Sequence, residues 1–258
     1  MDMSIIELDK INKVFHVGTQ DVTILTGIKL EILVGDFLII FGPSGCGKST
    51  LLHVMLGLEA PTSGTAHFLN YNFYSYPEDD RSDFRKRHIG MVYQQPNWIK
   101  SLTVVENVAF PLSLLGIDAL TRKKKGHEML KLVDMDSWCD YNPDELSSGQ
   151  QQKVSMARAL ITDPEVIIAD EPTGNLDYAS GQELMELLKE LNATHGKTIV
   201  MVTHDLEYLH FAKTVVRMFD GSIIGVYTEG EKAKLLHDIK SKRGMTMQNV
   251  IKKPMVNV

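Results

Sequence analysis

The stretch Gly42-Pro43-Ser44-Gly45-Cys46-Gly47-Lys48-Ser49-Thr50 decides the fold of this 258-residue chain. It matches the phosphate-binding loop pattern G-x-x-x-x-G-K-[ST], with an apolar run at 37–41 before it and apolar residues at 51–56 after it. These flanks predict a buried strand and a helix. A glycine-rich turn between the two points backbone N–H groups at an anion, and the helix adds the positive end of its dipole. The segment therefore predicts an α/β fold that binds a nucleoside triphosphate.

The residues of this loop have different expected roles. We expect the Lys48 ammonium to reach the β- and γ-phosphates and the Ser49 hydroxyl to ligate Mg²⁺. Cys46 occupies a spacer position, where its backbone N–H should matter and its thiol should not. The predicted ATP-binding residues of the loop are Gly42, Pro43, Ser44, Gly45, Cys46, Gly47, Lys48, Ser49 and Thr50.

The composition excludes several classes of protein. The apolar fraction of 43% and the charged fraction of 23% are those of a globular chain, and no apolar run reaches the roughly 20 residues that span a bilayer. The N-terminus carries Asp2 and Glu7 where a signal peptide carries cations. Two cysteines, Cys46 and Cys139, give no disulfide framework, so a reducing cytosol is expected. The net charge of −6 gives no reason to expect nucleic-acid binding.

The charge is unevenly distributed along the chain. Residues 229–258 carry seven Lys or Arg and three acidic residues, so this segment has a charge of +4 and the remainder −10. A basic tail can be attracted to an anionic membrane surface, and a solvated charged end is the alternative. We predict that 229–258 is a basic C-terminal tail outside the folded domain.

The remaining chain reads as a nucleotide-binding core interrupted by helices. Short apolar runs between residues 5 and 32 predict an N-terminal antiparallel β-subdomain, and a closing hairpin is expected at 215–224. Helices are expected after about residue 94, with Thr103, Thr121 and Ser147 as caps. We predict one domain over 1–228. Its core and β-subdomain occupy 1–93 and 162–228, and a helical subdomain is inserted at 94–161.

Two carboxylates follow a second buried strand. The apolar run 166–169 ends at Asp170 and Glu171, and a parallel strand delivers its last residues to the crevice where ligands bind. Asp170 is expected to hold Mg²⁺, and Glu171 to polarise the water that attacks the γ-phosphate. A strand that ends in solvated acids is the alternative, and the nearby phosphate loop favours the catalytic interpretation.

The segment Leu146-Ser147-Ser148-Gly149-Gln150 resembles the Leu-Ser-Gly-Gly-Gln signature of ATP-binding-cassette ATPases. It precedes Asp170 by the spacing that the family shows. Further landmarks of the family follow in order, and the resemblance covers residues 4 to 228. They are Tyr93-Gln94, Gly174-Asn175-Leu176-Asp177 and Val202-Thr203-His204-Asp205.

This resemblance implies roles for residues outside the phosphate loop. Gln94 would sense Mg²⁺ and the γ-phosphate, His204 would contact the γ-phosphate and hold Glu171, and Phe15 would stack on adenine. Asp177, on the loop that follows the carboxylates, would also contact the bound ATP. Each residue has an ordinary alternative: a polar strand end for Gln94, a surface histidine for His204 and a core aromatic for Phe15.

The resemblance also implies a homodimer. Two copies would pair head to tail, so that each ATP lies between the phosphate loop of one copy and Ser147, Gly149 and Gln150 of the other. Hydrolysis would then remove the charge that holds the copies together. Ser148 stands where the family usually has glycine, and a side chain there should weaken ATP-driven dimerisation.

Within the family, the segments 87–95, 102–108, 110–112 and 171–177 resemble lipoprotein-releasing, macrolide-exporting and cell-division ATPases. The resemblance implies a peripheral ATPase at the cytoplasmic face of the inner membrane, bound there through a separate integral membrane subunit. Trp98 lies where that subunit would dock and is a candidate contact, with ordinary packing as the alternative.

The alternative function is an ATPase of this family that acts on nucleic acid or ribosomes. Chromosome-maintenance relatives insert hundreds of coiled-coil residues between phosphate loop and signature, whereas 99 positions separate Lys48 from Ser147 here. Translation-factor relatives carry two cassettes in one chain, and this chain has one. Both observations favour the transport class.

Overall fold

The computed structural model describes residues 3–69, 71–233, 235 and 237. The N-terminal part forms an antiparallel sheet with strand order β2-β1-β4-β5. The runs between residues 5 and 32, which the sequence predicts as separate short strands, form two long strands, because shifts of register bend β1 without ending its pairing. The strands of this sheet are β1 (Ser4–Val17), β2 (Gln20–Leu33), β4 (Ser63–Phe68) and β5 (Tyr71–Asn72).

The second sheet has six strands in the order β10-β9-β3-β8-β7-β6 and carries the predicted α/β core. Five of them run parallel, and β10 pairs antiparallel with β9 in the predicted closing hairpin. The residues of β3 and β8 are all buried, as expected for strands covered on both faces. The strands are β3 (Phe37–Phe41), β6 (Ile89–Tyr93), β7 (Val166–Asp170), β8 (Thr198–Thr203), β9 (Thr214–Phe219) and β10 (Ser222–Tyr227).

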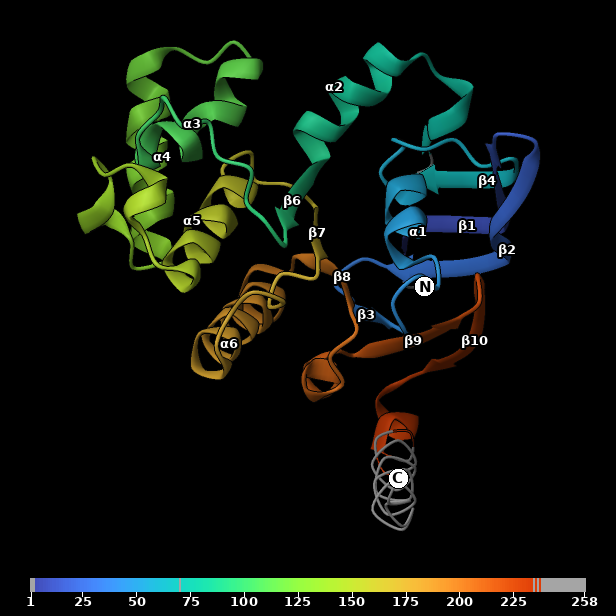
Figure 1. Ribbon diagram of the computed structural model, residues 1–258. Helices are drawn as coiled ribbons and strands as arrows, with labels where there is room; N and C mark the ends of the chain where they lie inside the picture. The colour runs from blue at the N-terminus through green and yellow to red at the C-terminus, as the bar shows by residue number, and fades with distance from the viewer. Residues whose placement is uncertain (1–2, 70, 234, 236, 238–258) are drawn as a thin grey trace, which may run out of the picture.

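The alternation along β3 shows how the two faces of this sheet are covered. Leu38 and Ile40 pack with α1 (Lys48–Met55) and the antiparallel sheet in one core. Ile39 and Phe41 point the other way and pack with α6 (Tyr178–His195) and the short helix η4 (Glu207–Phe211). The phosphate-loop helix α1 therefore lies between the two sheets (Figure 1).

Three helices between β6 and β7 form a group with its own apolar core, seen at the left of Figure 1. They are α3 (Val104–Leu114), α4 (Ala119–Leu132) and α5 (Ser148–Leu160), with the short turns η2 (Asp136–Trp138) and η3 (Pro143–Glu145) between the last two. This arrangement confirms an inserted helical subdomain; the exact boundaries at 94 and 161 stay predictions.

Two of the three predicted helix caps are confirmed and one is wrong. Thr103 caps α3 and Ser147 caps α5, each within a reciprocal capping box. Thr121 was expected to cap α4, but Asp118 does so, because its carboxylate accepts the Thr121 N–H at 3.0 Å. Like Thr, Asp is a good cap, because its side chain accepts an unpaired N–H group of the first turn. The helix therefore begins earlier than predicted.

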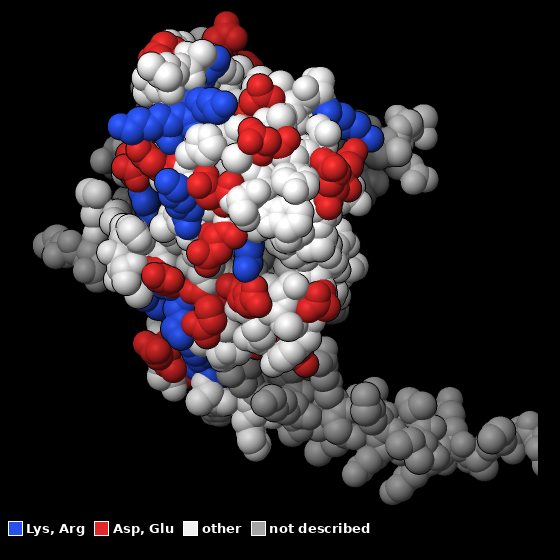
Figure 2. Space-filling view, turned by 90° about the vertical axis from the view of Figure 1, so that its left-hand side faces the viewer, with Lys and Arg blue, Asp and Glu red and all other residues white. Residues whose placement is uncertain are grey.

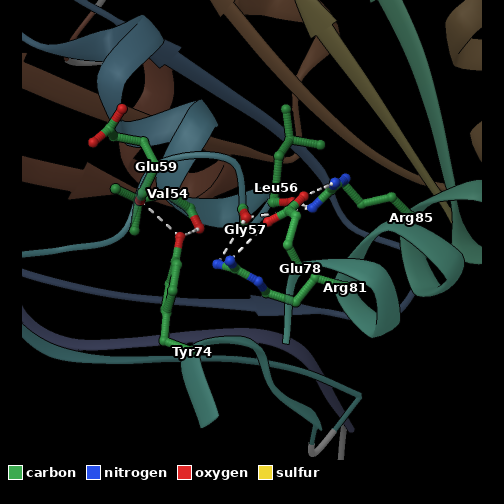
Figure 3. A network of polar contacts seen from close by, with 8 residues as sticks. All are labelled: Val54, Leu56, Gly57, Glu59, Tyr74, Glu78, Arg81 and Arg85. Carbon is green, nitrogen blue, oxygen red and sulfur yellow. Dashed lines mark hydrogen bonds and ion pairs between the residues drawn. The ribbon is translucent and has the colours of Figure 1, made fainter. Parts of the chain in front are cut away.

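The C-terminal end of α1 is held by side chains of α2 (Glu78–His88) and η1 (Phe73–Ser75), as Figure 3 shows. Arg81 and Arg85 donate to the Gly57 carbonyl oxygen at 3.2 and 3.3 Å, and Glu78 pairs with both guanidinium groups. The Tyr74 hydroxyl lies 2.7 Å from a carbonyl oxygen of the last turn of α1. The last carbonyls of a helix lack partners within it, and cations there complement its dipole. The network therefore stabilises the helix that follows the phosphate loop.

The described part of the C-terminal segment starts with a helix at residues 229–233. Lys232 is buried and donates to the carbonyl oxygens of His210 and Ala212. The remainder of the predicted basic tail, 234, 236 and 238–258, lies outside the described residues. Within the residues that are described, no helix is both long and apolar enough to cross a membrane.

Candidate nucleotide-binding site

The phosphate loop adopts the conformation that its glycines allow. Gly45 and Gly47 have φ angles of +79° and +99°, in the left-handed region that favours glycine. A Cβ atom at Gly47 would lie 2.9 Å from a backbone oxygen of β2. Lys48 is 6% exposed, and its ammonium donates to the carbonyl oxygens of Gly42 and Pro43 at 2.9 and 3.1 Å. The ammonium is thus directed into the loop, where an anion would meet it.

Cys46 belongs to the apolar core beneath the loop. Its side chain is 4% exposed and packs with the core that contains α1. Its N–H donates to the Pro43 carbonyl oxygen at 3.3 Å, and its carbonyl oxygen accepts the Gly221 N–H at 3.1 Å. The thiol therefore has a packing role in this structure.

Asp170, at the end of β7, lies beside Ser49 of the phosphate-loop helix. Burial raises the pKa of the Asp170 carboxyl, the neighbouring Glu171 raises it further, and a hydrogen bond with Ser49 acts in the opposite direction. One carboxylate and one hydroxyl fit Mg²⁺, which takes its other ligands from phosphates and water. The part of the chain that the structure describes has no group of three His, Cys, Asp or Glu side chains that could hold a metal alone.

The raised pKa of Asp170 predicts an effect on stability. A carboxyl whose pKa is raised on folding makes its full contribution to stability below its usual pKa of 3.8, and this contribution is lost as the pH rises through the higher folded-state pKa. We therefore expect Asp170→Asn to raise the melting temperature of the nucleotide-free protein at pH 7. The gain should shrink toward pH 4, and ATP hydrolysis should be lost. Thermal melts across this range, with the exposed Asp79→Asn as control, test this; an equal gain at every pH contradicts it.

Glu171 lies between a histidine and the phosphate-loop lysine. Its carboxylate Oε2 is 2.6 Å from Nδ1 of His204, and Oε1 is 4.0 Å from Nζ of Lys48. Its φ angle of +45° is unusual for a residue with a side chain, and such backbone strain is typical of functional sites. The strands β7 and β8 are neighbours in the sheet, which is why Glu171 and His204 meet. This pair has the geometry of a carboxylate base held by a histidine.

Gln94 is hydrogen-bonded to the loop that follows the two carboxylates. Its Nε2 donates to Oδ1 of Asn175 at 3.4 Å. Gln152, which is 2% exposed on α5, donates from Nε2 to the carbonyl oxygens of Tyr93, Gln94 and Pro172 at 3.0 to 3.1 Å. Sequence reasoning missed Gln152; the one available signal was an amide on the apolar face of a helix that also carries Val154 and Met156. Gln152 therefore connects α5 to the segment that follows β6 and to the segment that follows β7.

The signature residues lie at the start of α5, against α6. Ser147 Oγ accepts the Gln150 N–H at 3.3 Å, and Gln150 Oε1 accepts the Ser147 N–H at 2.9 Å. A Cβ atom at Gly149 would lie 2.8 Å from Oγ of Ser180. Ser180 in turn donates from its backbone N–H and its hydroxyl to Asp177, and these bonds lower the pKa of the Asp177 carboxyl. The signature and the start of α6 therefore form one surface.

The structure separates the signature from the phosphate loop. Among the described residues, no hydrogen bond or ion pair joins 147–150 to 42–50, and in Figure 1 α5 lies with the helical group while α1 lies beside the antiparallel sheet. One chain thus carries two sets of predicted ATP contacts that do not meet within it.

Phe15 lies on β1 and is partly exposed. The Lys13 ammonium is 4.6 Å from the centroid of its ring, and Lys13 also pairs with Glu59 at 2.5 Å. These contacts place a cation against the aromatic ring, and the stacking of Phe15 on adenine stays a prediction.

Comparison with known proteins agrees with this arrangement. The family model described as ABC transporter matches residues 25–174. The chain is 39% identical over 223 residues to the lipoprotein-releasing system ATP-binding protein LolD of Legionella pneumophila, covering 86% of this chain and 98% of that protein. It is 40% identical over 223 residues to the macrolide export ATP-binding/permease protein MacB of Syntrophobacter fumaroxidans, covering 86% of this chain and 31% of that protein.

A solved structure is similar over the same part of the chain. The ATP-binding cassette MJ0796, described as a dimer in a post-hydrolysis state bound to ADP and Pi, superimposes with a TM-score of 0.81 at 36% identity, covering 86% of this chain and 98% of that one. MJ0796 is an ABC transporter ATP-binding protein of Methanocaldococcus jannaschii. The chain described here therefore belongs to the ABC transporter family, as an ATP-binding ATPase.

Proposed function

We propose that two copies of this chain hydrolyse ATP at their shared interface and thereby drive a separate integral membrane subunit. The observation that supports this most strongly is the separation of the phosphate loop from the signature within one chain. A second copy, related by two-fold symmetry, would bring the missing half to each ATP. The similar structure of MJ0796 is a dimer.

The described geometry supports distinct roles in hydrolysis. Lys48 binds the β- and γ-phosphates, and Ser147, Gly149 and Gln150 of the second copy approach from the other side, with the positive end of α5. A water oxygen attacks the γ-phosphorus, its proton passes to the Glu171 carboxylate, and the bond to the ADP oxygen breaks. His204 positions Glu171 for this transfer.

Mg²⁺ would be held by residues that already contact one another. Ser49 and Asp170 supply the hydroxyl and carboxylate. Gln94 follows β6, the strand beside β7, so it starts next to Asp170 in the sheet. When bound, Mg²⁺ neutralises charge on the phosphate oxygens. The adenine would stack on Phe15, whose ring already faces the Lys13 ammonium.

A groove between the core and the helical group is the proposed docking site of the membrane subunit. It has a volume of about 480 Å³, and apolar side chains from both parts line it. They include Leu56 and Leu58 after α1, Ile99 after the Gln94 loop, and Phe110 and Leu114 of α3. A segment of the membrane subunit bound here would contact both the residues that follow α1 and the residues that follow Gln94. A movement of either part of the ATP site would therefore reach the bound segment.

Trp98 does not line this groove. Its indole Nε1–H donates to Gln151 at 3.0 Å, and the Arg158 guanidinium lies 4.6 Å from its ring. Arg158 also donates to the carbonyl oxygens of Pro96 and Asn97. These contacts favour the packing interpretation of Trp98 and make Ile99, Phe110 and Leu114 better candidates for partner contacts.

The relatives named above are transport proteins, which favours this function over action on nucleic acid or ribosomes. We propose a lipoprotein-release or macrolide-efflux type of system, with the ATPase bound to the cytoplasmic face of the inner membrane through its partner. ATP would power movement in that partner, which selects the substrate.

Affinity purification of the chain from detergent-solubilised membranes tests this function. We expect an integral membrane protein to co-purify, and Leu114→Glu, in the groove, to reduce its recovery at least tenfold. Ile224→Glu, which changes a similarly exposed side chain on β10, should leave recovery unchanged. Recovery of ribosomal or DNA-repair proteins alone would instead support the nucleic-acid alternative.

A further inference from the structure

Four consecutive cationic residues occupy the first two turns of α4. Lys123, Lys124 and Lys125 are exposed, and Arg122 is partly exposed. In the described part of the chain none of the four forms an ion pair. The cations of α2 differ, because Arg81, Arg85, Lys86 and Arg87 all pair with Glu78 or Asp83 of the same helix.

This position is electrostatically unfavourable within the chain alone. The N-terminal turns of a helix carry the positive end of its dipole, which disfavours cations there. Two acidic residues lie at helical spacing from the run, Asp118 four residues before Arg122 and Glu128 four residues after Lys124, but neither forms an ion pair with it, and Asp118 accepts the Thr121 N–H instead. A solvated charged helix face usually carries compensating pairs at i,i+3 or i,i+4, as α2 does. Among the described residues the run on α4 forms no such pair, so its charge is free to meet an external anionic partner.

An exposed apolar side chain accompanies the cations. Leu120 is 83% exposed, more than any other large apolar side chain in the described residues. Leu120 and Lys124 are four residues apart on the helix, so they share a face. Exposed leucine beside unpaired lysine is typical of segments that lie at the interface of an anionic membrane.

The run lies beside the docking groove. Arg122 and Lys123 line a cavity of about 440 Å³ together with Phe110 and Ser113 of α3 and with the acidic Glu106 and Asp140, whereas Lys124 and Lys125 do not line it. Phe110 also lines the groove, so the two surfaces are continuous. Figure 2 looks at the side of the molecule that carries the helical group, where cationic side chains gather toward the top of the view with acidic side chains beside them. A membrane subunit in the groove would bring this surface close to the bilayer.

We infer that the first two turns of α4, with Leu120, bind anionic phospholipids at the membrane surface. The orientation of this surface toward the membrane rests on the proposed function. Lipid binding by the isolated chain can be measured without the partner. An acidic segment of a protein would suit the cations too, but the exposed Leu120 favours a lipid surface, where an apolar side chain can enter the interface.

Co-sedimentation with vesicles of phosphatidylcholine, with and without phosphatidylglycerol, tests the inference. Wild-type protein should bind only the vesicles that contain phosphatidylglycerol, and less so at high salt. Changing Lys123, Lys124 and Lys125 together to Gln should lower the partition coefficient about 10- to 100-fold. The matched control changes Lys29, Lys131 and Lys189 to Gln; these exposed lysines form ion pairs and should leave binding nearly unchanged.

Wild type and both variants keep residues 229–258, so any contribution of the basic tail to vesicle binding is the same in all three. Equal vesicle binding by wild type and the Lys123, Lys124 and Lys125 variant would overturn the inference, as would no binding by wild type. Normal vesicle binding by that variant combined with lost co-purification of a membrane protein would assign the cations to an acidic protein segment instead. Absence of any co-purifying membrane protein, with vesicle binding intact, would count against the proposed function alone.

Discussion

Replacing Glu171 with glutamine is expected to lower the rate of ATP hydrolysis by about 10²- to 10⁴-fold while ATP still binds. Glutamine keeps the shape of the side chain and can still contact His204, but its amide cannot accept the proton of the attacking water. The phosphate loop, with Lys48 and Ser49, is left unchanged. Phosphate release measures the first effect, and nucleotide binding at equilibrium measures the second.

The same variant should accumulate as an ATP-bound dimer. The proposed interface contains the γ-phosphate, which persists when hydrolysis is blocked, so the copies have no reason to separate. Light scattering after size-exclusion chromatography in Mg·ATP should show twice the monomer mass. Glu186→Gln, on the exposed face of α6, is the control and should behave as wild type. A variant that stays monomeric in saturating Mg·ATP would contradict the shared site, and normal hydrolysis would remove Glu171 from its role.

Lys48→Met should weaken ATP binding by about 10- to 100-fold, the loss expected when charge-assisted hydrogen bonds to phosphate are removed. Methionine retains much of the apolar stem of lysine, so the packing of this nearly buried position changes little. Titration with a fluorescent ATP analogue measures the dissociation constant.

The control for this variant is Lys29→Met, at an exposed lysine of β2 paired with Asp9. Its dissociation constant should match that of wild type. ADP should be affected less than ATP by Lys48→Met, because the proposed contact includes the γ-phosphate. Equal weakening of both nucleotides would place the ammonium at the β-phosphate alone.

The elements that the sequence predicts correctly are those whose signals are local in the chain. The strand, loop and helix around Lys48 were predicted because their pattern is local: an apolar run, glycines at positions of positive φ, and an apolar helix. Thr103 and Ser147 were predicted as caps for the same reason. Asp118 was missed in favour of Thr121, since both are good caps near the start of the same helix.

The contacts of Gln152, Arg158 and Trp98 could not be predicted in this way. Each depends on how α5 packs against loops that lie 53 to 62 residues away along the chain. The groove and the unpaired cations of α4 are also products of packing, because a run of lysines in a sequence does not show whether acidic side chains from other elements lie next to it.

By itself, the sequence determined that this chain binds ATP and belongs to its family, because the phosphate loop, the paired carboxylates and the signature are short segments whose chemistry follows from residue type and spacing. Only the tertiary structure decided that His204 meets Glu171, that the signature lies apart from the phosphate loop, and that cations of α4 line a cavity next to the groove. Such relations depend on which strands are neighbours in the sheet and which helix faces are left uncovered, and these are set by packing across the whole chain.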